Sequence, residues 1–504
     1  MMNEYIIRPE SKAAFTNNAF FCVGTGRMGL ALQKEYLDQL KYLQDTIGFS
    51  HMRGHGLFCD DMAIYEVIEC PDGQKSVSYN FTYLDRVYDS YLSLGIKPFI
   101  ELGFMPGKMS SGDQTIFYWK GNTTPPADYD QWADLIRHYL LHLIDRYGKA
   151  EVQTWPCEVW NEPNLKGFWK DADMQEYFRL YKVSVTAVKD ILPEMPVGGP
   201  AVCGGENNPV WMRSFLEYCD TNDLPLDFFS RHIYMAQTPA RIGKYVYHAM
   251  TAPENSIAEA EETRKLIDSF DRYKGLPLHI TEFNTSYNPR CPTHDTIYNG
   301  ALICALLSRL GDTCSSYSYW TFGDVFEETG VYDRLFHGGF GLIAEGNISK
   351  PTYWTYRFFK ELYSDCVLHE DNAVVTRNGN IYKGVLWNLC QPEKDTMFEE
   401  KVSITVPAEK DKEYVCIIRR IDAAHGNPLK VWHDIGEPAT LNREQKELLI
   451  AASAPEIITK TVVSDGENVS FNIDLSANAF AHITVKPVSR STSLGYTYPK
   501  AENE

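Results

Sequence analysis

Short apolar runs alternate with longer amphipathic segments along the first two thirds of the chain. Residues 96–102 are mostly apolar, which is typical of a buried strand. Residues 129–147 repeat large apolar side chains at the three- and four-residue spacing of a helix, and Gly148 follows as its stop. The alternation predicts that strands and helices follow one another along the chain.

The same strand–helix pattern can be followed eight times between residues 20 and 365. The expected strands lie at 20–23, 49–53, 96–102, within 155–164, and at 196–202, 226–234, 278–283 and 315–322. The expected helices lie at 33–47, 83–94, 129–147, 174–192, 209–219, near 258–273, and at 295–310 and 352–363. Eight such units predict an α/β fold of the (β/α)8 TIM barrel type. A doubly wound sheet, the alternative, would use fewer units.

The pattern changes after residue 366, where short strands of alternating polarity are separated by turn residues. These strands predict an antiparallel β-sandwich, interrupted by a helical insert at 442–453. The expected organisation is a catalytic barrel at 15–365 and an accessory sandwich at 366–504, which ends in a C-terminal tail. Residues 1–14 form an N-terminal segment that can join the sandwich as an edge strand.

Composition and charge restrict the partners that this chain can take. A formal net charge of −19 over 504 residues repels nucleic acid and anionic membranes. No apolar run approaches the ~20 residues of a membrane span, and the first ten residues lack a secretion signal. The 12 cysteines are scattered without a C-x-x-C pair, which favours reduced thiols in a cytoplasm over disulfides or a zinc site.

Several motifs in the sequence bear on other chemistries. Residues 24–29 fit G-x-G-x-x-G, but a dinucleotide site needs an acid at the end of the next strand, where residues 53–56 read RGHG. His51, His55 and His232 could join carboxylates around a metal, yet no H-x-H pair closes a strand. No G-x-S-x-G, H-E-x-x-H or phosphate-loop motif occurs. We therefore expect neither a metal nor an organic cofactor.

Polar residues recur at the carboxyl ends of the expected strands, which is where barrels of this type carry their chemistry. They are Arg53, His55, Glu101, Asn161, Glu162, His232, Tyr234, Glu282, Asn284 and Trp320. Any one of them can have a structural role instead. Glu158, deeper in its strand, can be a buried ion-pair partner, and His55 can bond a backbone carbonyl. The functional interpretation rests on the whole set.

Two of these residues suggest a specific reaction. Glu162 precedes Pro163, which stops the fourth strand, and Glu282 lies at the end of the seventh. Strands four and seven are three places apart in an eight-strand ring, so their ends face each other across its mouth. Two facing carboxylates are what glycosidic cleavage requires, because one protonates the leaving oxygen and the other meets the anomeric carbon. A 13% aromatic content also suits platforms for sugar rings.

The motifs also resemble a known family. The pair of residues 160–164 (WNEPN) and 280–282 (ITE) resembles the clan of retaining glycosidases that carry catalytic glutamates after strands four and seven. More specifically, the chain resembles bacterial β-xylosidases of glycoside hydrolase family 39 over nearly its whole length. The motifs that carry this likeness are residues 22–27 (CVGTGR), 53–57 (RGHGL), 117–119 (FYW), 161–166 (NEPNLK), 318–322 (SYWTF), 337–341 (HGGFG) and 425–428 (HGNP).

The resemblance implies a retaining, exo-acting β-D-xylosidase that releases xylose from xylo-oligosaccharides. Glu162 matches the general acid/base, Glu282 the nucleophile, and Asn161 the residue that bonds the sugar 2-hydroxyl. The remaining matches to the sugar pocket are Arg53, His55, Phe117, His232, Tyr234, Trp320 and one of Glu327 and Glu328, with Glu328 taken as the pocket acid.

The resemblance further implies a homo-tetramer. The alternatives are an α-L-iduronidase-like or other retaining glycosidase of the same clan and, more remotely, a non-catalytic carbohydrate-binding protein.

Overall fold

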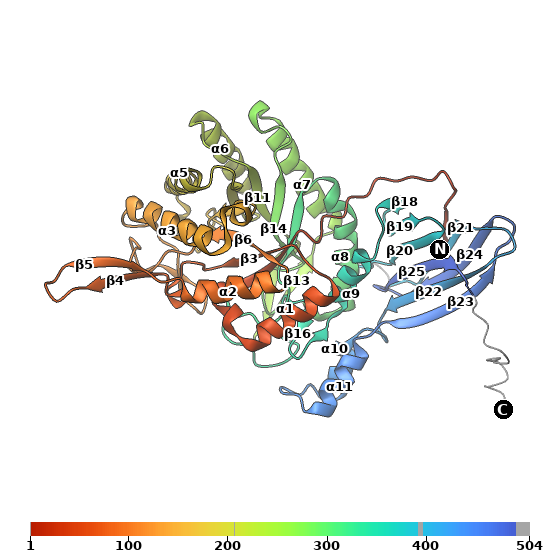
Figure 1. The fold of residues 1–504 in the computed structure, drawn as a ribbon. Helices are drawn as coiled ribbons and strands as arrows, with labels where there is room; N and C mark the ends of the chain where they lie inside the picture. Colours follow the sequence, from red (N-terminus) through yellow and green to blue (C-terminus); the bar gives the residue numbers. More distant parts are fainter. Residues whose placement is uncertain (1, 206, 392–396, 490–504) are drawn as a thin grey trace.

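The computed structural model describes residues 2–205, 207–391 and 397–489. Eight parallel strands close into a barrel, which confirms the predicted (β/α)8 fold (Figure 1). In order round the ring the strands are β2 (Cys22–Arg27), β3 (His51–His55), β6 (Lys97–Leu102), β9 (Cys157–Val159), β10 (Val197–Val202), β11 (Phe228–Tyr234), β14 (Leu278–Asn284) and β15 (Ser316–Tyr319).

The principal helices surround this ring and bury their apolar faces against it. They are α1 (Lys34–Thr46), α2 (Thr82–Ser93), α3 (Tyr129–Tyr147), α5 (Met174–Ile191), α6 (Asn208–Thr221), α7 (Pro253–Asp268), α8 (Ile297–Arg309) and α9 (Pro351–Lys360). Short turns of helix lie between them, at α4 (Lys149–Val152), η1 (Met28–Leu32), η2 (Asp60–Met62), η3 (Lys170–Ala172), η4 (Asp271–Tyr273), η5 (Pro292–Asp295) and η6 (Leu310–Asp312). Helix α3 has the bounds that the apolar spacing predicts.

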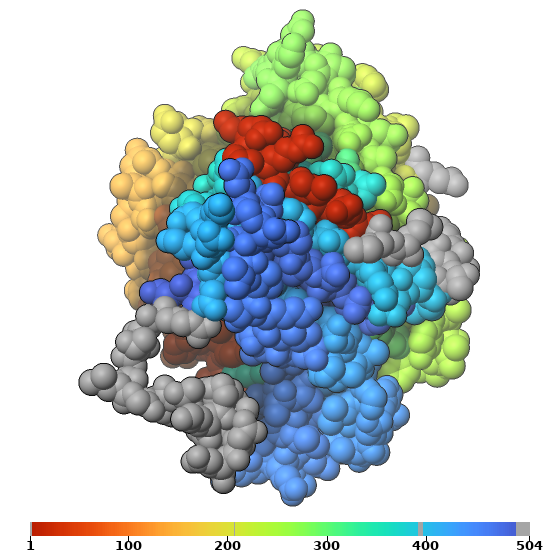
Figure 2. Space-filling model, turned by 90° about the vertical axis from the view of Figure 1, so that its right-hand side faces the viewer, coloured from red at the N-terminus to blue at the C-terminus, as the bar shows by residue number. Residues whose placement is uncertain are grey.

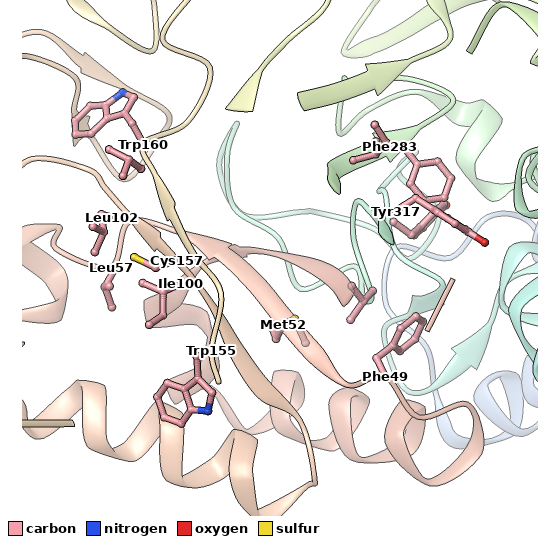
Figure 3. Close-up of a cluster of buried hydrophobic side chains, with 14 of the residues drawn as sticks. Phe49, Met52, Leu57, Ile100, Leu102, Trp155, Cys157, Trp160, Phe283 and Tyr317 are labelled. Atoms are coloured by element: carbon pink, nitrogen blue, oxygen red, sulfur yellow. The ribbon is translucent and has the colours of Figure 1, made fainter. Parts of the chain in front are cut away.

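The main core lies between the ring of strands and the helices. Figure 3 shows Ile100, Leu102 and Cys157 side by side on neighbouring strands, with Trp155 at the lower end of β9. Trp155 is fully buried and meets Tyr88 of α2 edge-on, with ring centroids 5.7 Å apart. Burial of such aromatic side chains contributes roughly 2–3 kcal/mol each to the stability of this core.

The ring closes where β15 meets β2, with Tyr319 opposite Val23. Gly24 follows Val23, and a Cβ there would lie 2.4 Å from Trp320 Cε3. The backbone N–H of Phe322 also donates to the carbonyl of Gly24 over 2.9 Å. The first glycine of the G-x-G-x-x-G pattern is therefore needed for close packing between the first and last strands.

Hairpins that the periodicity did not predict extend the loops of the barrel. They are β4 (Tyr65–Glu69) with β5 (Lys75–Tyr79), β7 (Thr115–Ile116) with β8 (Gly121–Asn122), β12 (Ala236–Ile242) with β13 (Tyr245–Met250), and β16 (Ile343–Ala344) with β17 (Ile348–Ser349). The β4–β5 hairpin projects far from the barrel in Figure 1. Its strands are largely exposed, so they lack the apolar alternation that identifies a strand from sequence.

Two sheets follow the barrel and enclose a second core. The six-stranded sheet contains β18 (Asp365–Glu370), β19 (Ala373–Asn378), β20 (Ile381–Trp387), β25 (Phe480–Pro487), β22 (Glu413–Ile421) and β23 (Glu456–Val463), with antiparallel neighbours. The three-stranded sheet contains β1 (Met2–Ile6), β21 (Glu400–Pro407) and β24 (Asn468–Leu475). Side chains of both sheets form one apolar cluster that includes Val375, Ile404, Phe471 and Ile483.

The N-terminal strand β1 pairs with β21 in parallel register, and Figure 2 shows the N-terminal residues lying across the C-terminal sheets. The predicted helical insert is α11 (Arg443–Ala452), and a second helix that was not predicted, α10 (Pro428–Asp434), precedes it and forms part of the same insert. It returns to the barrel, where Trp432 and Leu449 pack against Phe336 and Ile348. The expected C-terminal tail lies largely outside the described residues, which end at 489. None of the described helices is long and apolar enough to cross a membrane.

Candidate active site

The chain turns sharply after β9, and this turn places Glu162. Trp160 has φ of 72° and Glu162 has φ of 47°, a left-handed conformation that is uncommon outside glycine. The backbone N–H of Glu162 donates to the carbonyl of Ala201 after β10 over 3.0 Å. Asn164 then bonds the backbone of Cys203 twice, through its oxygen and its nitrogen, at 3.1 Å each. The turn is thus fixed against the neighbouring strand, with the Glu162 side chain in the mouth of the barrel.

Glu282, near the end of β14, is held by donors on both of its oxygens. Arg53 Nη1 donates to Glu282 Oε1 over 2.8 Å, and Tyr234 Oη donates to Oε2 over 2.7 Å. His55 Nε2 lies 3.4 Å from Oε1. A carboxylate with a guanidinium and a phenol as donors is oriented and stabilised in its ionised form.

The two glutamates meet at His232. Its Nδ1 lies 2.8 Å from Glu162 Oε1 and 3.5 Å from Glu282 Oε2. One oxygen of each carboxyl and a ring nitrogen of His232 all lie within 4.8 Å of one another. The Nε2 of His232 is 3.5 Å from Arg53 Nη2, which can only donate, so the imidazole proton belongs on Nδ1.

Arg53 is buried completely and connects the site to the barrel interior. Its Nε donates to Glu158 Oε2 over 2.6 Å, and Nη2 lies 2.9 Å from Glu101 Oε2. Glu158 also accepts from Thr281 Oγ1 over 2.9 Å. We call Arg53 with Glu101, Glu158 and Glu282 the Arg53 cluster. Glu158 therefore occupies the buried ion-pair position considered for it from the sequence.

Asn161 lies in the same turn with its amide orientation fixed. Its Oδ1 accepts from Arg53 Nη2 over 2.9 Å, which turns Nδ2 away from the guanidinium. Nδ2 is buried and has no hydrogen-bond partner among the described residues. A buried unpaired N–H costs about 1–3 kcal/mol, so this donor is suited to a ligand hydroxyl.

A cavity of about 280 Å³ opens above these groups. His55 lies between Phe117 and Trp320, with ring centroids 6.1 and 4.6 Å away. Its Nδ1 is 2.7 Å from Glu101 Oε2, so this histidine binds a carboxylate rather than a backbone carbonyl. The lining residues are His55, Phe117, Asn161, Glu162, Leu165, Phe168, Cys203, Tyr234, Glu282, Tyr287, Trp320 and Glu328. A larger groove of about 630 Å³ lies elsewhere, against the C-terminal sheets, and contains none of the predicted site residues.

The two adjacent acids after β15 point to different places. Glu328 lines the cavity, whereas Glu327 accepts from Arg27 Nη2 over 2.7 Å and from Gln33 Nε2 over 3.0 Å. Arg53 and His232 do not line the cavity but lie behind the residues that do. The structure thus brings together the two predicted glutamates and the eight predicted sugar-binding residues, which either line the cavity or contact a residue that does.

Sequence reasoning missed Leu165, Phe168, Cys203 and Tyr287, which also line the cavity. Cys203 directly follows β10, so its place at a strand end was a usable signal. Leu165, Phe168 and Tyr287 lie in loops, where no periodicity indicates which side chains turn inward.

Burial and charge shift the pKa values of the two glutamates unequally. Burial raises the pKa of Glu162 well above its ordinary value, and the nearby Glu282 carboxylate raises it further. Burial also raises the pKa of Glu282, but the charge of Arg53 and the hydrogen bonds from Tyr234 and Arg53 oppose that shift. A single proton on this pair therefore belongs to Glu162. Burial lowers the pKa of His55 to about 3, so that histidine is neutral.

Glu162, His232 and Glu282 are spaced closely enough to hold a metal ion. However, Arg53 already supplies a positive charge to Glu282, and a cation at this position would lie close to the guanidinium. The donor set is therefore better suited to an acid–base pair than to a metal.

Comparisons with known proteins agree with the geometry. The model of glycosyl hydrolases family 39 matches residues 7–469. A β-xylosidase of Geobacillus stearothermophilus is 47% identical over 485 residues, covering 95% of this chain and 94% of the relative. A β-xylosidase of Caldicellulosiruptor saccharolyticus is 36% identical, covering 92% of this chain and 94% of the relative.

Among solved structures, a monomeric β-xylosidase from Caulobacter crescentus superposes with a TM-score of 0.88 at 32% identity, covering 97% of this chain and all of that one. The match to the family model spans most of the chain, and both relatives align along nearly their entire lengths. The chain therefore belongs to glycosyl hydrolases family 39 and is a glycoside hydrolase.

Proposed function

We propose that this enzyme is a retaining, exo-acting β-D-xylosidase that releases xylose from the non-reducing end of xylo-oligosaccharides. The observation that carries the mechanism is the spacing of Glu162 and Glu282, because one oxygen of each carboxyl group lies within 4.8 Å of the other. Retaining glycosidases place their carboxyl groups about 5–5.5 Å apart, whereas inverting enzymes leave about 6.5–9.5 Å for a water. The relatives named as β-xylosidases support the choice of sugar.

The reaction has two displacements. Glu282, ionised, attacks the anomeric carbon while Glu162 gives its proton to the departing oxygen, so the glycosidic bond breaks as the glycosyl–Glu282 bond forms. Glu162 then takes a proton from water, whose oxygen attacks the same carbon and releases Glu282. The sugar leaves with its original anomeric configuration.

The change in role of Glu162 follows from the charge of its neighbour. Before the first step, ionised Glu282 raises the pKa of Glu162 and keeps it protonated. In the covalent intermediate Glu282 is a neutral ester, so that influence is lost and Glu162 becomes a base. The Nδ1 proton of His232 is 2.8 Å from Glu162 Oε1, which leaves Oε2 to carry the transferable proton.

The surrounding residues bind and orient the sugar. Asn161 Nδ2 is the donor for the 2-hydroxyl, a bond that strengthens in the transition state. Phe117 and Trp320 provide aromatic walls, and Glu328 and His55 provide polar contacts. Arg53, His232 and Tyr234 act on the substrate through the glutamates and Asn161 that they hold. A cavity of about 280 Å³ suits one terminal sugar, in keeping with exo action.

The cavity disfavours an α-L-iduronidase activity. A uronate carboxylate needs a free cation, but Arg53 already binds Glu101, Glu158 and Glu282. Lys166 is exposed and does not line the cavity. Glu328 would instead face the uronate with a second carboxyl group.

Hydrolysis of p-nitrophenyl β-D-xyloside, followed by NMR, tests the proposal directly. We expect β-xylose to appear first and to convert slowly to the α anomer, whereas α-xylose as the first product would show inversion. Glu162→Ala sharpens the test. It should spare glycosylation by activated aryl xylosides, while slowing cleavage of xylobiose by ~10³-fold, because a poor leaving group needs the acid. Equal slowing of both substrates would place the acid elsewhere.

We further propose a division into a catalytic barrel at residues 15–365 and an accessory sandwich at 366–504, with residues 1–14 joined to the sandwich. The family likeness predicts a tetramer, although the similar Caulobacter crescentus structure is described as monomeric. The scattered cysteines favour a location in the cytoplasm. Sedimentation equilibrium of the purified chain distinguishes a tetramer from a monomer.

A further inference from the structure

Lys350, the residue that precedes α9, is a fully buried lysine outside the cavity. Its Nζ lies 2.7 Å from Asp295 Oδ1 and 2.7 Å from Asp324 Oδ2, and it donates to the carbonyl of Gly339 over 2.9 Å. Three oxygens, two of them from carboxylates, thus surround the ammonium group at 2.7–2.9 Å. Charged lysine is rarely buried without such compensation, so the arrangement is specific. We call Lys350, Asp295 and Asp324 the Lys350 cluster.

The Lys350 cluster joins two loops of the barrel mouth. Asp295 ends η5 in the loop after β14, the strand that carries Glu282. Asp324 lies in the loop after β15, which also carries Trp320 and Glu328. This second loop, residues 320–342, contributes Trp320 and Glu328 to the lining of the cavity. Lys350 therefore attaches it to the loop that follows the candidate nucleophile.

The same cluster accounts for the glycines at residues 337–341. The second oxygen of Asp295 accepts from the N–H of Gly338 over 2.8 Å, and the second oxygen of Asp324 accepts from the N–H of Gly341 over 2.7 Å. A Cβ on Gly339 would lie 2.5 Å from Asp324 Oδ1, and one on Gly341 would lie 2.5 Å from the backbone nitrogen of Asp324. The HGGFG segment is thus wrapped so closely around the charges that side chains do not fit.

Aromatic contacts connect the cluster to the sugar cavity. Phe340, between two of these glycines, packs on Phe326 with centroids 5.1 Å apart. Phe326 packs on Trp320 at 6.0 Å, and Trp320 lines the cavity together with Glu328. The carbonyl of Glu328 also accepts from the N–H of Tyr118 over 2.8 Å, which ties the loop to the neighbouring wall.

We propose that Lys350 is a positioning residue for substrate binding: its buried ammonium group fixes residues 320–342 and so sets the places of Trp320 and Glu328 in the cavity. The proposal rests on the proposed function, because it assigns those two side chains to the sugar. It gives the lysine a role at a distance, with no contact to the reacting atoms. Loosening the cluster should weaken ground-state and transition-state binding alike.

The test removes the charges without leaving buried carboxylates alone. Lys350→Met by itself would bury two like charges and could unfold the chain. The triple variant Lys350→Met, Asp295→Asn, Asp324→Asn keeps similar volumes and neutralises the cluster. Lys360→Met is the matched control, because Lys360 lies exposed at the end of the same helix and bonds the carbonyl of Gly48 over 3.2 Å.

In p-nitrophenyl xyloside hydrolysis we expect the triple variant to raise KM by about tenfold while kcat changes less than about threefold. A purely structural cluster would reduce the fraction of active molecules and leave KM unchanged, and that result would overturn the proposal. The increase in KM should shrink when Glu328→Gln is already present, because the two changes then act on one contact. Fully additive effects would also overturn it.

Hydrogen exchange gives a readout that does not depend on the sugar. Amides of residues 320–342 should exchange faster in the triple variant than in wild type or Lys360→Met. Unchanged exchange in this loop would overturn the positioning role even if wild type hydrolyses xylosides. If wild type did not hydrolyse xylosides, the proposed function would fail. Faster exchange in the triple variant would still show that the Lys350 cluster fixes residues 320–342.

Discussion

Two buried cations support the mouth of this barrel, and they are used differently. Arg53 divides its donors among Glu101, Glu158 and Glu282, so its charge lies beside the reacting groups. Lys350 binds two aspartates and a backbone carbonyl, and its partners are parts of loops. The Arg53 cluster includes the candidate nucleophile Glu282, whereas the Lys350 cluster is made of a lysine and two aspartates outside the cavity.

The difference follows from the shapes of the two side chains. A guanidinium is a planar fork, so it fixes the direction of each oxygen that it binds, which suits Glu282 and Asn161. An ammonium is a compact point charge, so it draws segments together without imposing one plane. For both cations burial alone would lower the pKa, but the surrounding carboxylates raise it above its ordinary value. Both side chains therefore stay charged, and the shape of each charged group determines whether it orients single oxygens or holds loops together.

The largest expected effect comes from removing Glu282, the member of the Arg53 cluster that takes part in the reaction. Glu282→Gly should lower kcat for p-nitrophenyl β-D-xyloside by ~10⁴-fold or more, because the nucleophile of the first displacement is gone. Added azide should then yield a glycosyl azide of inverted configuration, detected by mass spectrometry and NMR. Asp324→Asn in the Lys350 cluster should leave kcat within ~10-fold. Near-normal turnover of Glu282→Gly would assign the nucleophile to another residue.

A smaller effect tests whether the fork of Arg53 matters beyond its charge. Arg53→Lys keeps the positive charge but cannot bind all of its partners at once, so kcat/KM should fall by ~10³-fold. Steady-state kinetics measures the loss. Arg420→Lys is the control, since Arg420 also binds two carboxylates, Asp422 and Glu456, but in the C-terminal sheets. If both variants lose activity equally, the planar geometry of Arg53 has no special role.

The smallest effect concerns buried groups that lack a strong counter-charge. Phe21 stacks between His51 and His279, with centroids 4.5 and 5.5 Å away. Burial lowers the pKa of His51 to about 4 and that of His279 to about 3, from an ordinary 6.5. Each folded pKa is depressed, so the stability is present above pH 6.5 and is lost as pH falls toward the folded value.

Urea unfolding at pH 7.5 and pH 5.0 measures this loss. The free energy of unfolding of wild type should fall by ~2 kcal/mol per histidine between these pH values, in addition to other titrations. His279→Gln should remove about that amount of pH dependence. An identical pH dependence in the variant would show that His279 is protonated without penalty in the folded chain.

Much of the fold and the centre of the site could be predicted from sequence, because both follow from periodicity. Helix α3 is amphipathic along its whole length, and its predicted and observed bounds agree. Glu162 and Glu282 were found because both follow apolar strands in a closed ring. The edge strand β23 carries little apolar signal, since most of its residues face solvent.

The contacts that decide charge could not be predicted in this way. Nothing in the spacing of Arg53 and Glu158 indicates that their side chains meet inside the barrel. Lys350 precedes Pro351 at the start of a helix and reads as an exposed residue, yet it is fully buried. The glycines at 337–341 were the usable signal, because closely spaced glycines indicate a backbone that something approaches closely.

The seam of the barrel links synthesis of the chain to sugar recognition. Trp320 lines the cavity and fills the space that a side chain on Gly24 would need, so the first strand leaves room for a cavity residue of the last. A nascent chain contains Gly24 long before Trp320 has been made, so a partly synthesised barrel lacks this part of the cavity. A sugar ligand therefore binds only after the ring has closed and stabilises the finished molecule by mass action. Measured affinity for a sugar therefore reports the fraction of molecules in which the barrel has closed.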